Sequence, residues 1–458
     1  RDTDRSRGLG DVYKRQIRMN CAKMSKKVAF HTLGCKVNTY ETDAMEQMLL
    51  SHGYEIVSFE NQADIYIINT CSVTNMADRK SRQMLHKAKK KNPNAVVVAA
   101  GCYVQAAPKE VLADAGVDLV IGNNRKQDLV QILEDYFKEH REEAVIDINK
   151  EQEYEELELD FVSDHTRAYI KVQDGCNQFC SYCIIPYTRG RVRSRAKQDV
   201  ISEIKRIAKN GTKEVVLTGI HLSSYGKDLK DGTDLLDLIK SVQEVDGIQR
   251  IRLGSLEPRI ITLEFAQELR KLDKFCPHFH LSLQSGCEAT LKRMNRHYTP
   301  EEYYEKCELL REVFEHPAIT TDVIVGFPGE TEEEFEETYK FLEKVNFYEM
   351  HVFKYSKRKG TRAAEMENQV PEPIKTKRSN ILLELTRECS KRYRSFWIGR
   401  EVNVLLEEKI VLDGEVYTVG HTKEYVKAAV KGEFSSNTFI TGKINGFLNE
   451  EIVNLLAE

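Results

Sequence analysis

From residue 26 onward the chain alternates short apolar runs with helical stretches. The first apolar runs are residues 28–30, 65–68, 96–100 and 119–122, and each is followed by a turn and an amphipathic stretch. Strands that alternate with helices predict a parallel sheet covered by helices on both faces. A helix near residues 128–138 completes this part, so residues 24–145 are predicted to form one α/β domain.

A second series of six apolar runs begins near residue 167. The predicted strands are residues 168–172, 214–218, 248–253, 278–283, 320–325 and 350–355. Repeated strand-to-helix units without an antiparallel interruption predict a partial (βα)6 barrel over residues 166–374. The working face of such a barrel is the edge at which its strands end.

The pattern changes again after residue 374. Residues 375–396 combine basic and apolar positions at helical spacing and predict a connecting helix. Short alternating strands follow at residues 402–406, 416–419, 426–430 and 439–444. Alternating strands separated by turn residues predict a small antiparallel β-barrel over residues 397–458.

Two further segments have no predicted core. Residues 1–23 are polar and unpatterned, so we expect an artefactual or disordered extension with Met24 as the natural start, and we discount Cys21. Residues 146–165 contain the acidic run 151–160, which predicts a linker or an exposed flank rather than a site.

Composition narrows the class of protein. The 458 residues exceed what one hydrophobic core usually serves, and 41% hydrophobic residues are enough for ordinary packed cores. No run approaches the roughly 20 apolar residues of a membrane span, so we expect a soluble, cytoplasmic protein. Eleven cysteines in such a chain favour metal ligands over disulfides.

Charge is informative only locally. The net charge of −4 does not by itself indicate a nucleic-acid partner. Basic residues cluster at residues 87–91, 189–195 and 354–362. Each cluster alone is more often a solvated face or a helix terminus, but together they leave a polyanionic partner open.

Three cysteines, Cys176, Cys180 and Cys183, lie within eight residues just after the predicted strand 168–172. A short loop can turn three thiols toward one centre, and thiolates are the ligands of iron–sulfur clusters. A four-iron cluster held by three cysteines leaves one iron without a protein ligand, as a catalytic metal requires. The alternatives are a structural zinc site, which needs four ligands, and three unrelated buried cysteines.

Three more cysteines, Cys35, Cys71 and Cys102, each follow a predicted strand of the first domain. Parallel strands end at one edge of the sheet, where open α/β sheets bind ligands, so these thiols are predicted to converge. The alternative is that small thiols merely suit tight strand-to-helix turns. The remaining cysteines are expected to be ordinary buried residues: Cys276, Cys287, Cys307 and Cys389.

The C-x3-C-x2-C motif with Tyr182 before its last cysteine resembles the motif of the radical S-adenosylmethionine (SAM) enzymes. The loops at residues 34–41, 69–74 and 184–191 are similar to those of the methylthiotransferases of that superfamily. The resemblance implies a [4Fe–4S] cluster at Cys176, Cys180 and Cys183, and an auxiliary [4Fe–4S] cluster at Cys35, Cys71 and Cys102. It implies SAM contacts from Tyr182, Gly219, Glu257, Gln284 and Gly326. It also implies that the carboxy-terminal barrel is a TRAM-like RNA-binding domain.

Within this family the motifs are most similar to the branch that acts on N6-threonylcarbamoyladenosine at position 37 of tRNA. The resemblance implies that one SAM methylates sulfur at the auxiliary cluster. The radical formed from a second SAM then removes the hydrogen of adenine carbon 2, which the sulfur replaces. The implied partners are tRNA, an electron donor such as a flavodoxin or ferredoxin, and a sulfur donor.

The predicted phosphate contacts are the basic residues at the barrel mouth: Arg189, Arg191, Arg193, Lys354, Lys357 and Arg358. Sibling activities remain as alternatives, namely methylthiolation of isopentenyl-adenosine in tRNA or of a ribosomal-protein aspartate. A non-catalytic iron–sulfur RNA-binding protein is the alternative from another class.

Overall fold

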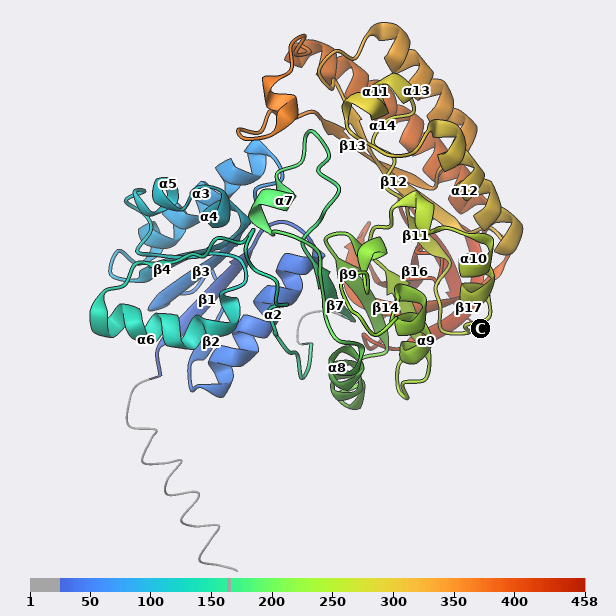
Figure 1. The fold of residues 1–458 in the computed structure, drawn as a ribbon. Coiled ribbons are helices and arrows are strands. Elements are labelled where there is room, and N and C mark those ends of the chain that lie inside the picture. The colour runs from blue at the N-terminus through green and yellow to red at the C-terminus, as the bar shows by residue number, and fades with distance from the viewer. Residues whose placement is uncertain (1–24, 163–165, 458) are drawn as a thin grey trace, which may run out of the picture.

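The computed structural model describes residues 25–162 and 166–457 (Figure 1). The extension predicted at residues 1–23 lies outside the described residues. In Figure 1 the amino-terminal sheet with its helices lies beside the barrel, and helix α2 (Lys36–Ser51) lies between the two.

The amino-terminal unit is a six-stranded parallel sheet in the order β2-β1-β3-β4-β5-β6. Its strands are β1 (Lys27–Thr32), β2 (Glu55–Val57), β3 (Ile65–Thr70), β4 (Val96–Gly101), β5 (Leu119–Ile121) and β6 (Glu143–Ala144). Every residue of β3 is buried, as is typical of a parallel strand covered on both faces. The four predicted strands are confirmed, whereas the short edge strands β2 and β6 carry too few residues to form a periodic pattern.

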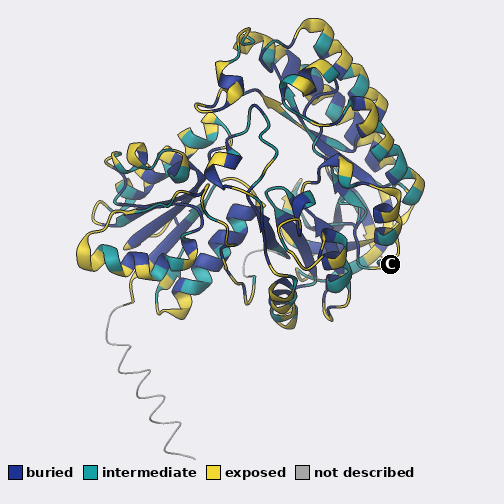
Figure 2. Ribbon diagram, viewed as in Figure 1, coloured by how far each residue is buried: buried dark blue, intermediate teal, exposed yellow. Residues whose placement is uncertain are grey.

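Helices cover both faces of this sheet. The helices besides α2 are α3 (Asn75–Lys91), α4 (Cys102–Ala106), α5 (Pro108–Leu112) and α6 (Leu129–Glu139). Apolar residues of α3, α4 and α5 pack in one core cluster, and those of α2 and α6 pack in another. The strands are therefore buried in Figure 2, while the outer helical faces are exposed.

The second unit is a partial barrel of six strand-to-helix repeats. Its strands are β7 (Arg167–Asp174), β9 (Glu214–Gly219), β10 (Arg250–Leu253), β11 (His278–His280), β12 (Ala318–Val325) and β13 (Glu349–Lys354). The ladders β10-β9-β7 and β11-β12-β13 are joined through Leu256, whose N–H donates to the His280 carbonyl at 2.8 Å. All six predicted strands are confirmed, and no ladder joins β7 to β13 within the described ranges, so the barrel is partial as predicted.

The outer layer of this barrel is helical. Its helices are α8 (Lys197–Lys209), α9 (Leu235–Gln243), α10 (Leu263–Arg270), α11 (Glu288–Arg293), α12 (Pro300–Val313) and α13 (Glu332–Val345). The short helix α7 (Ile185–Thr188) instead follows the cysteine loop and contacts α4 of the amino-terminal unit (Figure 1). The two-residue strand β8 (Arg193–Ser194) pairs antiparallel with the end of β7. This pairing folds the chain back over the end of β7, where the cysteine loop begins.

The acidic segment between the two units is packed on one side and exposed on the other. Leu157 and Leu159 are fully buried in the same core cluster as Tyr40 of α2 and Ile170 of β7. Glu155 is also buried and accepts hydrogen bonds from the backbone N–H groups of residues 126 and 127. The acids Glu153, Glu156, Glu158 and Asp160 are exposed, as expected for a flank, whereas the leucines that alternate with them point inward, which was not expected.

The carboxy-terminal unit is a closed five-stranded barrel in the order β14-β15-β16-β18-β17. Its strands are β14 (Glu401–Leu412), β15 (Glu415–His421), β16 (Lys427–Lys431), β17 (Phe439–Phe447) and β18 (Val453–Ala457). The small barrel is confirmed, but β16 and β18 pair in parallel, and β18 was not predicted. The predicted basic helix is α14 (Glu372–Ser395), which buries Leu382 and Leu385.

This small barrel docks beneath the partial barrel, at the end where the strands begin. Arg250 donates to the His421 carbonyl at 2.7 Å, and Arg252 donates to the Lys423 carbonyl at 2.7 Å. Both arginines are buried, and Arg252 also pairs with Glu214 at 2.8 Å. The opposite end of the barrel, where the strands finish, is therefore left free for ligands. No helix of the described residues is long and apolar enough to cross a membrane.

Candidate functional site

Three cysteines converge at the carboxyl edge of the amino-terminal sheet. Cys35 lies between β1 and α2, Cys71 follows β3, and Cys102 opens α4 directly after β4. The three strands are neighbours in the sheet. Gly34 has a φ of +111°, and a Cβ there would stand 3.0 Å from Cys71 Cβ, so glycine lets the first loop approach the second. The predicted convergence of the three loops is what the structure shows.

Polar side chains hold these cysteine loops in place. Asn38 donates to the carbonyls of Leu33 (2.7 Å) and Thr70 (3.0 Å), and its own amide oxygen lies 3.9 Å from Cys35 Sγ. Burial and the neighbouring Cys102 raise the pKa of Cys71 to about 12, so this thiol is protonated until a metal displaces the proton.

The second cysteine loop starts from a glycine whose position tolerates no side chain. Gly175 has a φ of +71°, and a Cβ there would stand 1.8 Å from the Arg191 carbonyl oxygen. The next residue, Cys176, donates its backbone N–H to the Gly190 carbonyl at 3.0 Å. Burial raises the pKa of Cys176 to about 11, and burial together with Cys180 raises the pKa of Cys183.

Asn295 and Arg296, which the sequence did not indicate, hold this second cysteine loop in place. Asn295 donates to the carbonyls of Gln178 (3.3 Å) and Phe179 (3.1 Å), and Arg296 donates to Cys180 Sγ at 3.3 Å. The Arg296 guanidinium therefore places a positive charge beside the Cys180 sulfur. These residues lie 116 positions from their partners and belong to no motif quoted above, so no local signal pointed to them.

The glycine at position 175 gives a direct test of the loop geometry. We expect Gly175→Ala to lower the free energy of unfolding by about 2–5 kcal/mol, because a positive φ and a clash with backbone add up. It should also lower the iron content after anaerobic reconstitution. Gly414→Ala is the matched control, since Gly414 has a φ of +80° and nothing within 4 Å of its Cβ position. Equal behaviour of the two variants in thermal denaturation would contradict this account.

The spacing of the thiols bears on the kind of metal centre. Four sulfurs around a single zinc ion lie about 3.8 Å apart, given a Zn–S distance of roughly 2.3 Å. Within the described residues, neither cysteine set brings its three sulfurs within 4.8 Å of one another. Each set also supplies three sulfurs, one fewer than the four ligands of the closed structural zinc site considered above. The four remaining described cysteines are buried, as expected.

The predicted SAM contacts all follow barrel strands on the side of the cysteine loop. Tyr182 packs edge-on against Phe327, with ring centroids 6.4 Å apart. Gln284 has a φ of +77° and donates its backbone N–H to the Asp322 carbonyl at 2.9 Å. Glu257 is buried and accepts from Arg259 at 2.7 Å.

The glycines among these contacts have close neighbours of their own. A Cβ at Gly219 would stand 2.9 Å from Gln173, and one at Gly326 would stand 2.3 Å from Lys375 of α14. Nearby His221 has a buried Nε2 that finds no hydrogen-bond partner among the residues that the structure describes. Burial and the charge of Arg296 lower the pKa of His221 to about 4, so its imidazole is neutral. An unpaired buried nitrogen beside Gly219 fits a polar ligand in this region.

Three of the predicted RNA contacts are buried instead. Arg189, Arg193 and Arg358 are at most 7% exposed. Arg358 pairs with Asp78, and Arg193 lies 3.9 Å from Asp174. The prediction was wrong for these three arginines because acidic partners distant in sequence hold them inside. Arg191, Lys354 and Lys357 are exposed and stay predictions.

An interdomain ion cluster lies behind both cysteine loops. It consists of Glu41, Lys126, Lys171, Asp174 and Arg189. Glu41 of α2 contacts Arg189 at 2.8 Å, Lys171 at 2.9 Å and Lys126 at 3.1 Å. Asp174 contacts Lys171 at 2.8 Å and also accepts from the Gly175 N–H at 2.8 Å. The ion cluster therefore fixes the start of one cysteine loop against the domain that carries the other.

Two side chains extend this link to the cysteines themselves. Arg189 donates to Asn38 at 2.7 Å, and Asn38 lies beside Cys35. Asn123 donates to Cys102 Sγ at 3.5 Å and to the Thr188 carbonyl at 2.7 Å, five residues after Cys183. The two cysteine loops thus share a rigid, buried support across the interface.

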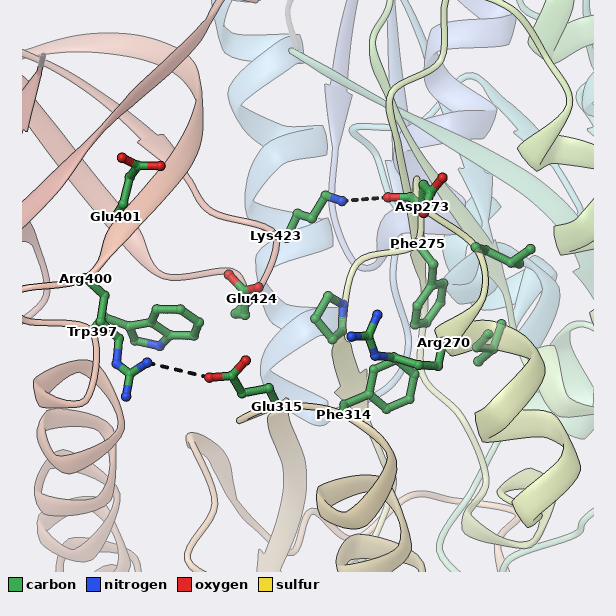
Figure 3. A pocket seen from close by; sticks show the side chains of 13 residues that line it. Arg270, Asp273, Phe275, Phe314, Glu315, Trp397, Arg400, Glu401, Lys423 and Glu424 are labelled. Carbon is green, nitrogen blue, oxygen red and sulfur yellow. Dashed lines mark hydrogen bonds and ion pairs between the residues drawn. The ribbon is translucent and has the colours of Figure 1, made fainter.

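A pocket of about 410 Å³ lies elsewhere, beneath the partial barrel (Figure 3). It is lined from both sides of the junction with the small barrel, with Lys423 donating to the Asp273 carbonyl and Arg400 paired with Glu315. Phe275 and Pro277 in its wall precede β11, whereas the cysteine loops follow strands. Its mixed charges and its position separate it from the cysteine sites.

The comparisons with known proteins agree with these observations. The Radical SAM superfamily matches residues 170–342, and Uncharacterized protein family UPF0004 matches residues 27–122. The Threonylcarbamoyladenosine tRNA methylthiotransferase MtaB of Bacillus subtilis is 44% identical over 407 residues, which cover 88% of this chain and 90% of that protein. A tRNA-2-methylthio-N(6)-dimethylallyladenosine synthase of Acetivibrio thermocellus is 36% identical over 420 residues, which cover 90% of this chain and 86% of the relative.

Among solved structures, the radical S-adenosylmethionine methyltransferase TsrM from Kitasatospora setae matches with a TM-score of 0.53 at 15% identity, covering 72% of this chain and 75% of that one. This likeness shows the fold alone. The match to methylthiotransferases over most of both chains, together with the two cysteine sets, shows that the chain belongs to the radical SAM methylthiotransferase family.

Proposed function

We propose that this protein converts N6-threonylcarbamoyladenosine at position 37 of tRNA to its 2-methylthio derivative. The observation that carries the proposal is the 44% identity to a relative named for this activity, over 90% of that relative's length. Relatives named for dimethylallyladenosine are 36% and 38% identical. That sibling activity is the second candidate.

Enzymes of this family use S-adenosyl-L-methionine and [4Fe–4S] clusters. We assign one cluster to Cys176, Cys180 and Cys183 and the auxiliary cluster to Cys35, Cys71 and Cys102. SAM is assigned to Tyr182, Gly219, Glu257, Gln284 and Gly326. When bound, these groups would supply the one-electron chemistry that breaks an aromatic C–H bond and the sulfur that takes the place of the hydrogen. No protein side chain can supply this chemistry.

The protein's own residues position these groups. Asn295 fixes the loop that carries Cys180, and Arg296 places a positive charge beside the Cys180 sulfur. Asn123 holds Cys102 against the chain that follows Cys183. Cys71 and Cys102 are buried, whereas Cys35 is exposed and the three cysteines of the barrel loop are partly accessible, so both centres can be reached by a ligand.

The proposed RNA contacts are the three exposed basic residues at the barrel mouth. The Arg191 guanidinium lies 4.5 Å from the centre of the Phe179 ring, which holds it at the cysteine loop. Lys357 is exposed, and its carbonyl accepts from Asn75 at 2.9 Å, so it lies at the interface of the two domains. Phosphates of an anticodon loop that reaches the interface would meet both charges.

Neutralising Arg191, Lys354 and Lys357 together should weaken tRNA binding and its salt dependence. Each lost phosphate contact is expected to reduce the slope of log K against log salt by roughly 0.7–0.9. The measurement is the dissociation constant for tRNA at several salt concentrations. Lys138→Gln, on the outer helix α6, is the control and should change neither quantity. An unchanged slope in the triple variant would remove these residues from the interface.

Two partners follow from the chemistry. A one-electron reduction requires a donor such as a flavodoxin or ferredoxin, and repeated turnover requires a sulfur donor. We propose that the enzyme acts in the cytoplasm, because its proposed substrate is tRNA.

Mass analysis of tRNA nucleosides with and without the gene tests the proposal. The 2-methylthio form of N6-threonylcarbamoyladenosine should disappear without the gene and return when the gene is restored. Loss of the dimethylallyladenosine derivative instead would favour the second candidate. If the tRNA nucleosides were unchanged without the gene and a ribosomal-protein aspartate lost its methylthio group, the ribosomal-protein alternative would be favoured. Failure to form 5′-deoxyadenosine from SAM and reductant would favour the non-catalytic alternative.

A further inference from the structure

Three polar side chains lie together in the partial barrel, on the neighbouring strands β11, β12 and β13. They are His280, Asp322 and His351, and each offers one nitrogen or oxygen atom within 4.8 Å of the atoms offered by the other two. Asp322 pairs with His351 in the strand register, and His280 Nε2 lies 3.3 Å from Asp322 Oδ2. Among the residues that the structure describes, no other three histidine, cysteine or carboxylate side chains come together in this way.

Strand alternation turns the three side chains toward the inside of the barrel. Their neighbours along the three strands, Phe279, Val323 and Val352, pack in the main hydrophobic core together with residues of the outer helices. Successive side chains of a strand point to opposite faces of the sheet. The three polar side chains therefore share the inner face, where adjacent strands hold their backbones at fixed spacing.

A small ion can reach this group without any opening of the barrel. The side chains of Asp322 and His280 are 28% and 13% accessible, and His351 is exposed. His351 also lines a pocket of about 820 Å³, whose wall includes Ser390 of α14 and Tyr425 of the small barrel. The group thus lies at the edge of a cavity that is separate from both cysteine loops.

The hydrogen bonding of the two histidines leaves ligand atoms available. His280 Nδ1 lies 3.0 Å from the Thr320 hydroxyl. When Nδ1–H donates to this hydroxyl, the lone pair of Nε2 is directed toward the Asp322 carboxylate, and histidines that bind metals are commonly oriented by such a bond. The His351 ring forms no hydrogen bond with any residue in the ranges 25–162 and 166–457. Two imidazole nitrogens and one carboxylate are therefore free to share a cation.

We propose that His280, Asp322 and His351 form a binding site for one divalent transition-metal cation such as Zn²⁺. Two imidazoles and a carboxylate are the donor set of open metal sites, in which water or another small ligand takes the remaining position. Donor atoms around a tetrahedral zinc ion lie about 3.3 Å apart, so the three atoms need to approach one another by about 1.5 Å at most. The site uses no cysteine, and the inference does not depend on the function proposed above.

The test is the zinc content of the holoenzyme. Protein with both clusters reconstituted is incubated anaerobically with Zn²⁺ and freed of excess ion by gel filtration, and both metals are counted by plasma mass spectrometry. The wild type should retain about one zinc per chain beside its iron, because three preformed ligands bind one ion. His351→Leu and Asp322→Asn should each lose this zinc and keep their iron, which also shows that they fold.

The matched control is His86→Leu. His86 Nε2 lies 2.6 Å from Asp114 Oδ1, so this pair resembles His280 and Asp322 but has no third ligand among the described residues. His86→Leu should retain its zinc. Thr320→Val should weaken zinc binding roughly 10- to 100-fold in competition with a chelator, because it removes the hydrogen bond that orients His280.

X-ray absorption at the zinc edge identifies the ligands directly. The expected spectrum has nitrogen and oxygen neighbours at about 2.0–2.2 Å and no sulfur at about 2.3 Å. Sulfur ligands would overturn the inference, because the zinc would then occupy cysteines. A wild type without stoichiometric zinc, or equal zinc in the wild type, His351→Leu and Asp322→Asn, would overturn it as well. None of these results bears on methylthiolation, which the nucleoside measurement tests separately.

Discussion

Replacing Cys102 by alanine is expected to abolish methylthiolation of tRNA while 5′-deoxyadenosine is still formed from SAM. Cys102 belongs to the edge of the amino-terminal sheet, whereas the loop that begins at Gly175 belongs to the barrel. Their shared contacts run through side chains such as Asn123, which can remain in place when one sulfur is removed. Both products are measured in one anaerobic reaction by mass spectrometry.

The matched variant is Cys180→Ala, which should lose both products because the barrel loop then cannot hold its cluster. Cys389→Ala is the control, since Cys389 is buried in α14 and belongs to neither set. If Cys102→Ala lost 5′-deoxyadenosine as completely as Cys180→Ala does, the two cysteine sets would not have separate roles.

Replacing Glu41 by glutamine is expected to lower the free energy of unfolding by about 3–5 kcal/mol, the usual cost of removing one partner from a buried charge pair. Glu41 is fully buried and contacts Arg189, Lys171 and Lys126. With the charge gone, these three cations are left with too few anions in a site that water cannot reach. Urea unfolding followed by circular dichroism measures the loss.

The same carboxylate sets an acid limit on stability. Arg189, Lys126 and Lys171 outweigh the effect of burial and hold the pKa of Glu41 well below its usual value. The Glu41 carboxylate therefore contributes its full stabilisation to the folded state above the usual carboxyl pKa. This stabilisation is lost as the pH falls toward the lowered pKa of Glu41 in the folded protein. Glu41→Gln should flatten this acid-side decline. Glu60→Gln, which removes an exposed partner of Lys87, should behave as the wild type does, and equal effects of the two variants would refute the role of the ion cluster.

Most strands could be predicted because each apolar run is followed by a turn and an amphipathic helical stretch. The short strands β2 and β6 could not, because two or three residues show no periodicity. The parallel pairing of β16 with β18 depends on closing the small barrel, and no local pattern encodes that closure.

The cluster cysteines could be predicted because each follows a strand or shares a short loop. The side chains that hold these cysteine loops in place could not be predicted. Arg189, Arg193 and Arg195 looked like an exposed basic run, since the acids that bury them are brought close only by folding. Glu41 lies 148 positions from Arg189. Asn295 and Arg296 act on the cysteine loop from a turn between two helices, where their residue types carry no distinctive signal.

Counting iron in the anaerobically reconstituted protein tests the central claim most directly. Two four-iron clusters, each held by three cysteines, predict about eight irons per chain in the wild type. They predict about four after alanine replaces Cys35, Cys71 and Cys102 together, and about four after alanine replaces Cys176, Cys180 and Cys183 together. A wild type with about four irons, or a triple variant that keeps all of its iron, would contradict the account.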